Sequence, residues 1–167
     1  PAKTDMDAYR KTITVYNGTD VLPSEVFLQE PAVGLAADPT TCSENPVDPN
    51  WVTRRHISYD YNSRNQVETI TDTSLDAQGV DETPRITNIQ YYDSSSPVEG
   101  LVELVDGPRT DVDDIQDFIY YETDSPGFYN TGDLQISRRY IDYLGGVSND
   151  TEITQYDNAG RPIITSR

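Results

Sequence analysis

Residues 151–165 read Thr151-Glu-Ile-Thr-Gln-Tyr156-Asp157-Asn158-Ala159-Gly160-Arg161-Pro-Ile-Ile-Thr165. A run of β-prone residues ends in a Tyr-Asp pair, the short segment Asn-Ala-Gly follows, and a second β-prone run comes after it. Asn and Gly are the residues that best tolerate the positive φ of a tight turn. A short link that contains Gly between two such runs is typical of a β-hairpin. The segment therefore predicts two antiparallel strands joined by a turn.

The same order of parts recurs upstream: an aromatic strand end, an acidic or amide residue, a turn with Gly or Asn, and a second strand. The other copies are centred on Tyr61-Asn62, Tyr92-Asp93 and Tyr121-Glu122. They follow one another at intervals of about 30 residues, and recurrence at a nearly fixed interval is typical of a repeat architecture. In the last two of these copies the turn is lengthened, by residues 94–99 and 125–130.

Each copy supplies the residue types that a turn requires. The carboxylate or amide after the tyrosine is suited to accept backbone N–H groups of the turn, and Gly or Asn supplies the left-handed residue. We therefore predict that the repeats are built by Tyr61, Asn62, Asn65, Tyr92, Asp93, Gly100, Tyr121, Glu122, Gly132, Tyr156, Asp157, Gly160 and Arg161. No catalytic, cofactor-binding or metal-binding residue is predicted.

The phrase Tyr156-Asp-Asn-Ala-Gly160-Arg161 resembles the repeat phrase of the Rhs, or YD-repeat, family of bacterial wall-associated and secreted proteins, to which animal teneurins are related. The family phrase is Tyr-Asp, two variable residues, Gly-Arg and an apolar residue, and Pro162 departs from it in the apolar position. Residues 105–112, Val-Asp-Gly-Pro-Arg-Thr-Asp-Val, are similar to the segment between repeats of bacterial Rhs proteins. The resemblance covers residues 55–167, and Tyr16-Asn17-Gly18 is compatible with a degenerate copy.

The resemblance implies a structural, non-catalytic segment of a large secreted or surface-exposed protein. In such proteins the repeats wind into a hollow β-shell that encloses a toxic domain or presents an adhesive surface. The implied location is extracellular or at the bacterial cell surface, and the implied partners are the rest of the parent polypeptide and neighbouring repeats. Because the chain opens on Pro1 and stops at Arg167, we expect an excerpt of a longer polypeptide. An ordinary tyrosine-rich β-domain with chance repetition is the alternative.

Hairpins that follow one another predict an all-β fold of antiparallel hairpin repeats, arranged as a curved meander or ribbon. Residues 11–16 and 24–30 are expected to be strands and residues 72–82 a loop. Two short stretches are candidates for a single helical turn: residues 24–30, capped by Ser24, as the alternative to a strand, and residues 111–117, capped by Asp111. Open sheet edges of such a meander predict strand pairing between copies.

The chain is expected to have two parts. Four prolines interrupt residues 31–49, a pattern that breaks regular elements. We place the boundary there, with N-terminal strands and the Pro-rich loop in residues 1–50 and the hairpin repeats in residues 51–167.

Composition excludes several classes of partner. Only 35% of the residues are hydrophobic, and 12 tyrosines against three phenylalanines and one tryptophan favour a thin, two-sided sheet. A formal charge of −17 repels nucleic acid and anionic lipid, so neither is expected as a partner. No apolar run approaches the 18 residues of a membrane span, so none is expected.

Few residues are candidates for chemistry. His56 is the only histidine, which excludes a histidine-based triad or a two-histidine metal site within the chain, and we expect it to be solvated on the polar face of a strand. The single cysteine, Cys42, is expected to be a free thiol. The acidic residues between Asp106 and Asp117 are compatible with Ca²⁺ but lack the glycine and distal glutamate of an EF-hand.

Two other functions remain open. Exposed aromatic side chains would make a carbohydrate- or cell-surface-binding module that stacks on sugar rings or binds a surface protein; the candidates are Trp51, Tyr59, Tyr61, Tyr91 and Tyr92. The competing use of these rings is packing between neighbouring strands. A hydrolase would need two carboxylates facing each other in a cleft.

Overall fold

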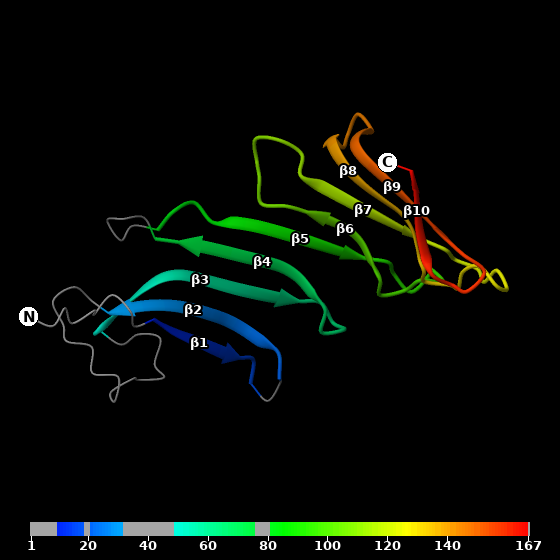
Figure 1. Cartoon of the computed structure of the whole chain (residues 1–167). Coiled ribbons are helices and arrows are strands. Elements are labelled where there is room, and N and C mark those ends of the chain that lie inside the picture. Colours follow the sequence, from blue (N-terminus) through cyan, green and yellow to red (C-terminus); the bar gives the residue numbers. More distant parts are fainter. Residues whose placement is uncertain (1–9, 19–20, 32–48, 76–80, 167) are drawn as a thin grey trace, which may run out of the picture. The chain divides into compact units, whose positions relative to one another are not determined.

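A computed structural model describes residues 10–18, 21–31, 49–75 and 81–166 of the chain (Figure 1). Within these ranges it contains strands and turns, and no helix. The strands are β1 (Lys11–Tyr16), β2 (Pro23–Pro31), β3 (Trp51–Tyr61), β4 (Val67–Ser74), β5 (Arg85–Tyr91), β6 (Val102–Asp106), β7 (Ile115–Tyr120), β8 (Leu134–Asp142), β9 (Val147–Tyr156) and β10 (Pro162–Ser166).

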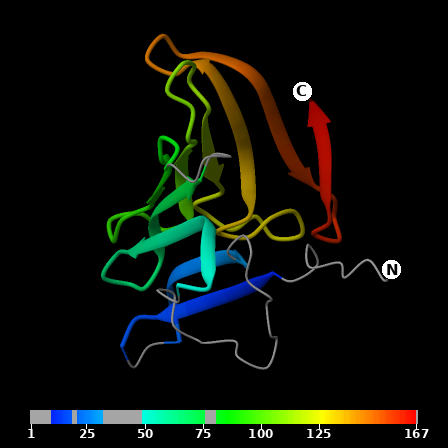
Figure 2. The same ribbon diagram turned by 90° about the vertical axis from the view of Figure 1, so that its left-hand side faces the viewer.

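The chain forms two compact units, residues 1–86 and residues 87–167. In the first unit β1, β2, β3 and β4 pair in sequence order, and every pairing is antiparallel. In the second unit β5 to β10 pair in the same manner, and Figure 2 shows β8, β9 and β10 following one another. The predicted all-β fold of successive antiparallel hairpins is confirmed. The Pro-rich boundary expected in residues 31–49 lies almost wholly outside the described residues.

Five hairpins share one starting point, a tyrosine that is the last residue of the first strand. We call these residues the ladder tyrosines: Tyr16, Tyr61, Tyr91, Tyr120 and Tyr156, paired with Pro23, Val67, Val102, Leu134 and Pro162. In the first four hairpins the second strand carries one extra residue immediately after this pair, which is a β-bulge. A bulge at the same place in successive hairpins indicates one repeated unit.

One local expectation was wrong, and one candidate element is not formed. The loop expected from residue 72 begins later, because β4 continues to Ser74 and the Asp72 side chain is held there by two arginines. The candidate helical turn at residues 111–117 is absent: residues 111–114 are irregular and β7 begins at Ile115. The strands expected at residues 11–16 and 24–30 are confirmed as β1 and β2.

The described residues bury few apolar side chains. Val98, Leu104 and Tyr140 are the buried apolar residues of the described ranges. Gln29 and Thr154 are the buried polar residues. The Gln29 amide donates to the Thr53 hydroxyl at 2.9 Å, which offsets part of the cost of its burial. Much of the stabilisation must therefore come from ladder hydrogen bonds and half-buried pairs between strands.

Candidate functional site

The turns that follow four of the ladder tyrosines share one hydrogen-bond frame. The residue directly after the ladder tyrosine is here called the turn-opening residue. It donates its N–H to the carbonyl of the residue just before the second strand, and its own carbonyl accepts the N–H of the residue one position earlier. At Asn62 these bonds run to the Gln66 carbonyl (2.9 Å) and from the Asn65 N–H (3.0 Å). The corresponding turn-opening residues are Asn62, Tyr92, Tyr121 and Asp157.

In each of these turns the residue that donates its N–H to the turn-opening carbonyl is left-handed, and each is one that the sequence marks. The φ angles are +61° at Asn65, +81° at Gly100, +92° at Gly132 and +72° at Gly160. Among the described non-glycine residues, Asn65 alone has a positive φ. The substitution of asparagine for the turn glycine therefore preserves the backbone of the repeat, as the tolerance of Asn for this region allows.

The frame corrects the alignment of two copies by one residue. Sequence comparison places Tyr92 and Tyr121 opposite Tyr61 and Tyr156, but the hydrogen bonds make them turn-opening residues. Their ladder tyrosines are Tyr91 and Tyr120. Tyr92 and Tyr121 therefore lie in the turns, one residue beyond the ends of β5 and β7.

Where the turn-opening residue is Asn or Asp, its side chain closes the turn. The Asn62 Oδ1 accepts the backbone N–H groups of Arg64 (2.9 Å) and Gln66 (3.1 Å). The Asp157 Oδ1 does the same for Ala159 (2.9 Å) and Arg161 (3.0 Å). The Arg161 backbone N–H and then its guanidinium lower the pKa of Asp157.

The two lengthened turns differ at the residue after the turn-opening tyrosine. Asp93 accepts the Ser95 N–H at 2.8 Å, so its carboxylate also braces a turn, although one residue further along. Glu122 is exposed. The acidic or amide residue of the repeat phrase therefore braces a turn in three copies, at Asn62, Asp93 and Asp157.

Substitution at the left-handed residue tests this account of the turn. Gly160→Ala is expected to lower the free energy of unfolding by about 1–2 kcal/mol, because alanine must adopt a positive φ although its Cβ would meet open space. Asn65→Ala is expected to cost about 1 kcal/mol, whereas Asn65→Gly should be neutral or stabilising. Urea denaturation measures all three, with Ser63→Ala as a control in the same turn. Equal effects of alanine and glycine at position 65 would contradict the assignment.

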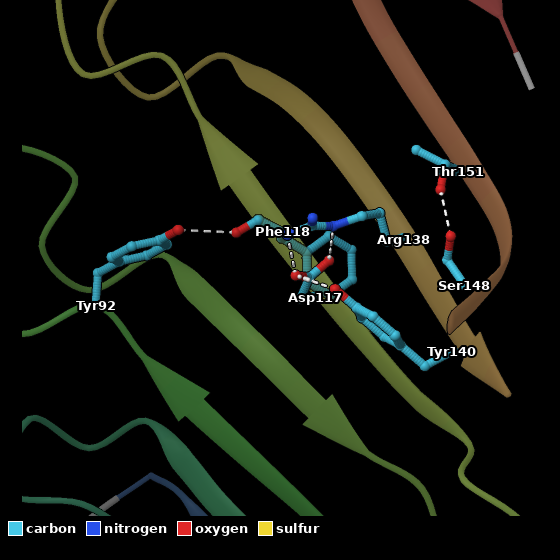
Figure 3. Close-up of polar contacts among 7 residues, drawn as sticks. All are labelled: Tyr92, Asp117, Phe118, Arg138, Tyr140, Ser148 and Thr151. Atoms are coloured by element: carbon cyan, nitrogen blue, oxygen red, sulfur yellow. Dashed lines mark hydrogen bonds and ion pairs between the residues drawn. The ribbon is translucent and has the colours of Figure 1, made fainter. Parts of the chain in front are cut away.

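Where the turn-opening residue is tyrosine, its side chain reaches the next hairpin (Figure 3). The Tyr92 hydroxyl donates to the Phe118 carbonyl on β7 at 3.0 Å, and its ring lies edge-on to Tyr120 with centroids 6.0 Å apart. Tyr121 repeats this one hairpin later: its hydroxyl contacts the Thr154 carbonyl at 3.4 Å, and its ring lies edge-on to Tyr156 at 6.1 Å. Each tyrosine thus joins its own hairpin to the first strand of the following one.

Two ladder tyrosines reach in the opposite direction. The Tyr61 hydroxyl donates to the Pro23 carbonyl at 2.6 Å, and the Tyr156 hydroxyl donates to the Leu134 carbonyl at 3.0 Å. Pro23 and Leu134 occupy the same position, the first residue of the second strand in the preceding hairpin. Burial raises the pKa of Tyr61 and Tyr156, so both hydroxyls keep their protons as donors near neutral pH.

Two charged clusters that the sequence analysis missed lie in mid-strand. Asp117 on β7 accepts two bonds from the Arg138 guanidinium and one from the Tyr140 hydroxyl on β8 (Figure 3). On β3 and β4, Asp72 pairs with Arg55 through two 2.8 Å bonds, and Arg85 approaches it at 3.1 Å. Residues of opposite charge near the middle of β-prone runs were the available sequence signal.

The pH dependence of the Asp72 cluster has a defined sign. The hydrogen bonds from Arg55 lower the pKa of Asp72 in the folded protein. The contribution of ionised Asp72 to the free energy of unfolding is therefore complete above the ordinary aspartate pKa of about 3.9, and it is lost as pH falls through the lower folded pKa. We expect Asp72→Asn to lower the Tm at pH 7 and to lose this effect progressively below about pH 4. Asp60→Asn, an exposed substitution on β3, is the control. A Tm difference that stays constant down to pH 2 would contradict the expectation.

The aromatic candidates for binding are all partly buried. The Lys11 ammonium lies over the Trp51 ring at 4.6 Å, and none of the five candidate stacking residues, Trp51, Tyr59, Tyr61, Tyr91 and Tyr92, is fully exposed. His56 is not merely solvated as expected, because its ring stacks on Phe27 at 4.4 Å and its Nε2 lies 3.1 Å from Glu25. Phe27 and His56 are direct partners across β2 and β3, which accounts for the stacking. Cys42 lies outside the described residues.

The acidic residues between Asp106 and Asp117 go to separate partners. Asp111 pairs with Arg109, Asp113 accepts the Tyr143 N–H at 2.6 Å, and Asp114 accepts the Arg109 N–H at 3.1 Å. Burial, with the nearby charges of Asp114 and Asp113, raises the pKa of Asp106. In the described part of the chain no group of three metal-ligating side chains is placed to hold a metal ion.

A cleft of about 550 Å³ lies beside these residues in the second unit. Its lining includes Val105, Arg109, Asp113, Arg139 and Tyr140. Asp114 also lines the cleft, and its carboxylate lies against Gly107. A side chain at position 107 would therefore require the Asp114 carboxylate, which accepts the Arg109 N–H, to move.

No helix long and apolar enough to cross a membrane occurs in the described ranges. Comparisons of the chain with protein-family models, with curated proteins and with solved structures found no match.

Proposed function

We propose that this chain is a structural repeat segment of a large secreted or surface-exposed protein of the Rhs, or YD-repeat, type. Its strands form part of the wall of a β-shell that encloses a toxin or presents an adhesive surface. Catalysis has no part in this role. The repeat-building tyrosines and turn residues then serve architecture.

The observation that carries the proposal is the use of one tyrosine contact in successive hairpins. Tyr92 and Tyr121 occupy the same place in their turns, contact the same backbone position two residues before the next ladder tyrosine, and lie edge-on to that tyrosine. Stacked repeats need a contact that links each hairpin to the next, because a single hairpin cannot bury its own face. Rings and carboxylates committed in this way are not available to a ligand.

Locating the parent protein tests the proposal. Antibodies raised against the 167-residue chain are expected to label intact source cells, or to detect antigen in the culture medium. On denaturing gels they should detect a polypeptide far larger than 18.7 kDa. Antibodies against a cytoplasmic protein of the same source, applied to the same intact cells, control for lysis. Antigen confined to the cytoplasm, or a product of 18.7 kDa alone, would reject the proposal.

A further inference from the structure

The turn between β1 and β2 contains Asn17-Gly18, the one place in the sequence where glycine follows asparagine. Asparagine is a thermolabile residue, because the backbone nitrogen of the next residue can attack its side-chain amide. Glycine leaves that nitrogen most open, since it carries no side chain. A hydrogen bond from the attacking N–H to another acceptor, or a group packed against it, opposes the reaction.

Four asparagines in the turns after β3, β7 and β9 are protected by hydrogen bonds. Asn62 uses its own side chain, whose Oδ1 accepts two turn N–H groups and whose Nδ2 donates to Gln66. At the other three, the N–H of the following residue donates to a side-chain oxygen of the same turn. The asparagines are Asn65, Asn130 and Asn158, and the bonds are Gln66 to Asn62 (3.1 Å), Thr131 to Asp124 (2.6 Å) and Ala159 to Asp157 (2.9 Å).

The Asn17-Gly18 peptide has neither kind of protection within the described ranges. The Asn17 N–H donates to the Leu22 carbonyl at 3.2 Å, but the Asn17 side chain and the Gly18 N–H have no hydrogen-bond partner among the described residues. Both residues are exposed. A Cβ placed on Gly18 would meet no described atom within 4 Å. The Asn17 amide is therefore free to reach the Gly18 nitrogen.

A second reactive dipeptide, Asp106-Gly107, shows the opposite arrangement. Aspartate followed by glycine can close the same ring with loss of water. Here the Gly107 N–H is directed at the Asp114 carbonyl at 3.4 Å, and the Asp114 carboxylate lies against Gly107. The fold therefore covers the nitrogen of Gly107 and leaves that of Gly18 open.

We propose that Asn17 is a site of spontaneous deamidation in the folded chain. The Gly18 backbone nitrogen forms a bond to the Asn17 Cγ, the bond from Cγ to the side-chain nitrogen breaks, and ammonia leaves with the proton of the Gly18 N–H. Water from the solvent then opens the five-membered succinimide at either of its two carbonyl groups. The products are aspartate and isoaspartate, and the reaction requires no enzyme, oxidant or cofactor.

Isoaspartate at position 17 changes the β1–β2 turn, because its main chain runs through the former side chain and is one carbon longer. In a hairpin the length of the loop helps to set the register of the strands. The loop is closed by the bond from Asn17 to Leu22, and the next residue, Pro23, carries the carbonyl that accepts the Tyr61 hydroxyl at 2.6 Å. Isoaspartate is therefore expected to loosen β1 on β2 and to weaken the contact of this hairpin with β3.

Peptide mapping by mass spectrometry tests the proposal on the folded 167-residue chain after incubation in mildly alkaline buffer. Asn17 is expected to lose its amide in most molecules, while Asn62, Asn65 and Asn158 keep theirs. Asn17→Gln is the matched variant and should stay intact, because glutamine would have to close a less favourable six-membered ring. The same incubation in urea should also give isoaspartate at Asp106, since unfolding uncovers the Gly107 nitrogen.

Hydrogen exchange tests the structural consequence. Each deamidated chain carries one more negative charge than the native chain, so anion exchange separates the two. In the isoaspartate form the amides of β1 and β2 are expected to exchange faster, whereas those of β8 and β9 should not change. Freshly prepared Asn17→Asp is the control, because it adds the charge without lengthening the main chain, and it should exchange as the native chain does.

Three results would overturn the inference. The first is an Asn17 amide that is no more labile in the folded chain than those of Asn62, Asn65 and Asn158. The second is isoaspartate that forms at Asp106 as fast in the folded chain as in urea, because the covering of Gly107 would then have no effect. The third is unchanged exchange of β1 and β2 in the isoaspartate form.

Discussion

Tyr121→Ala is expected to lower the free energy of unfolding by about 2–3 kcal/mol, measured by urea denaturation. The Tyr121 ring stacks on Tyr129 with centroids 3.7 Å apart and lies edge-on to Tyr156 at 6.1 Å. Truncation removes both ring contacts and the hydroxyl contact with the Thr154 carbonyl. Because Tyr121 is half-buried, the expected cost is below the 3–5 kcal/mol that is typical of a fully buried aromatic residue.

Matched variants separate the ring from the hydroxyl. Tyr121→Phe keeps both ring contacts and loses a hydroxyl contact of 3.4 Å, so it should cost well under 1 kcal/mol. Tyr92→Phe loses a shorter bond of 3.0 Å and should cost about 1 kcal/mol. Phe128→Ala, at a residue that is 50% exposed in the same loop as Tyr129, is the control for loss of an aromatic residue. Similar costs for Tyr121→Ala and Phe128→Ala would contradict the linking role.

Hydrogen exchange shows where the stability is lost. Tyr121 joins the β7–β8 hairpin to β9, so its truncation should increase amide exchange in β9 and β10 more than in β5 and β6. A uniform increase across the second unit would mean that the ring supports the sheet in general and does not join particular hairpins.

The strands and turns were predictable because their signals are local. The period-two pattern and the residues that tolerate positive φ lie within a few positions of each other, and Asn65 could be assigned as a glycine substitute from its place in the phrase. The one-residue error at Tyr92 and Tyr121 has a physical cause. Sequence comparison aligns tyrosines by residue type. The structure aligns them by the backbone hydrogen bonds that close each turn. A Tyr-Tyr pair satisfies either alignment.

The pairing within the charged clusters could not be predicted from local sequence patterns. Arg55 and Asp72 are 17 residues apart, and Asp117 and Arg138 are 21 residues apart. Which carboxylate meets which guanidinium depends on the register between strands, and a shift of one residue would move the partner to the other face. That register depends in turn on the length of each turn and on the bulge that follows the first pair of the β3–β4 and β7–β8 hairpins. The bulges have no clear sequence signature here.

Asp117→Ala is expected to lower the free energy of unfolding by about 2–4 kcal/mol. The substitution removes the bidentate partner of Arg138 and the acceptor of the Tyr140 hydroxyl, and Tyr140 is only 7% exposed. A buried hydroxyl without an acceptor costs more than the bond itself contributes. The Arg138 side chain is about one third exposed, so water screens part of its charge, and the expected cost is lower than for a fully buried pair.

A double-mutant cycle isolates the pair from its surroundings. Asp117→Asn, Arg138→Met and the double variant are expected to give a coupling free energy of about 1–2 kcal/mol, while Tyr140→Phe alone costs about 1 kcal/mol. The exposed pair Arg109–Asp111, with side chains 59% and 71% accessible, is the control and should show no measurable coupling. The two pairs are alike in chemistry, but Arg109 and Asp111 are more exposed and lie between β6 and β7, outside the strands. If their couplings were equal, placement between β7 and β8 would add nothing, and Asp117 would have to act through Tyr140 alone.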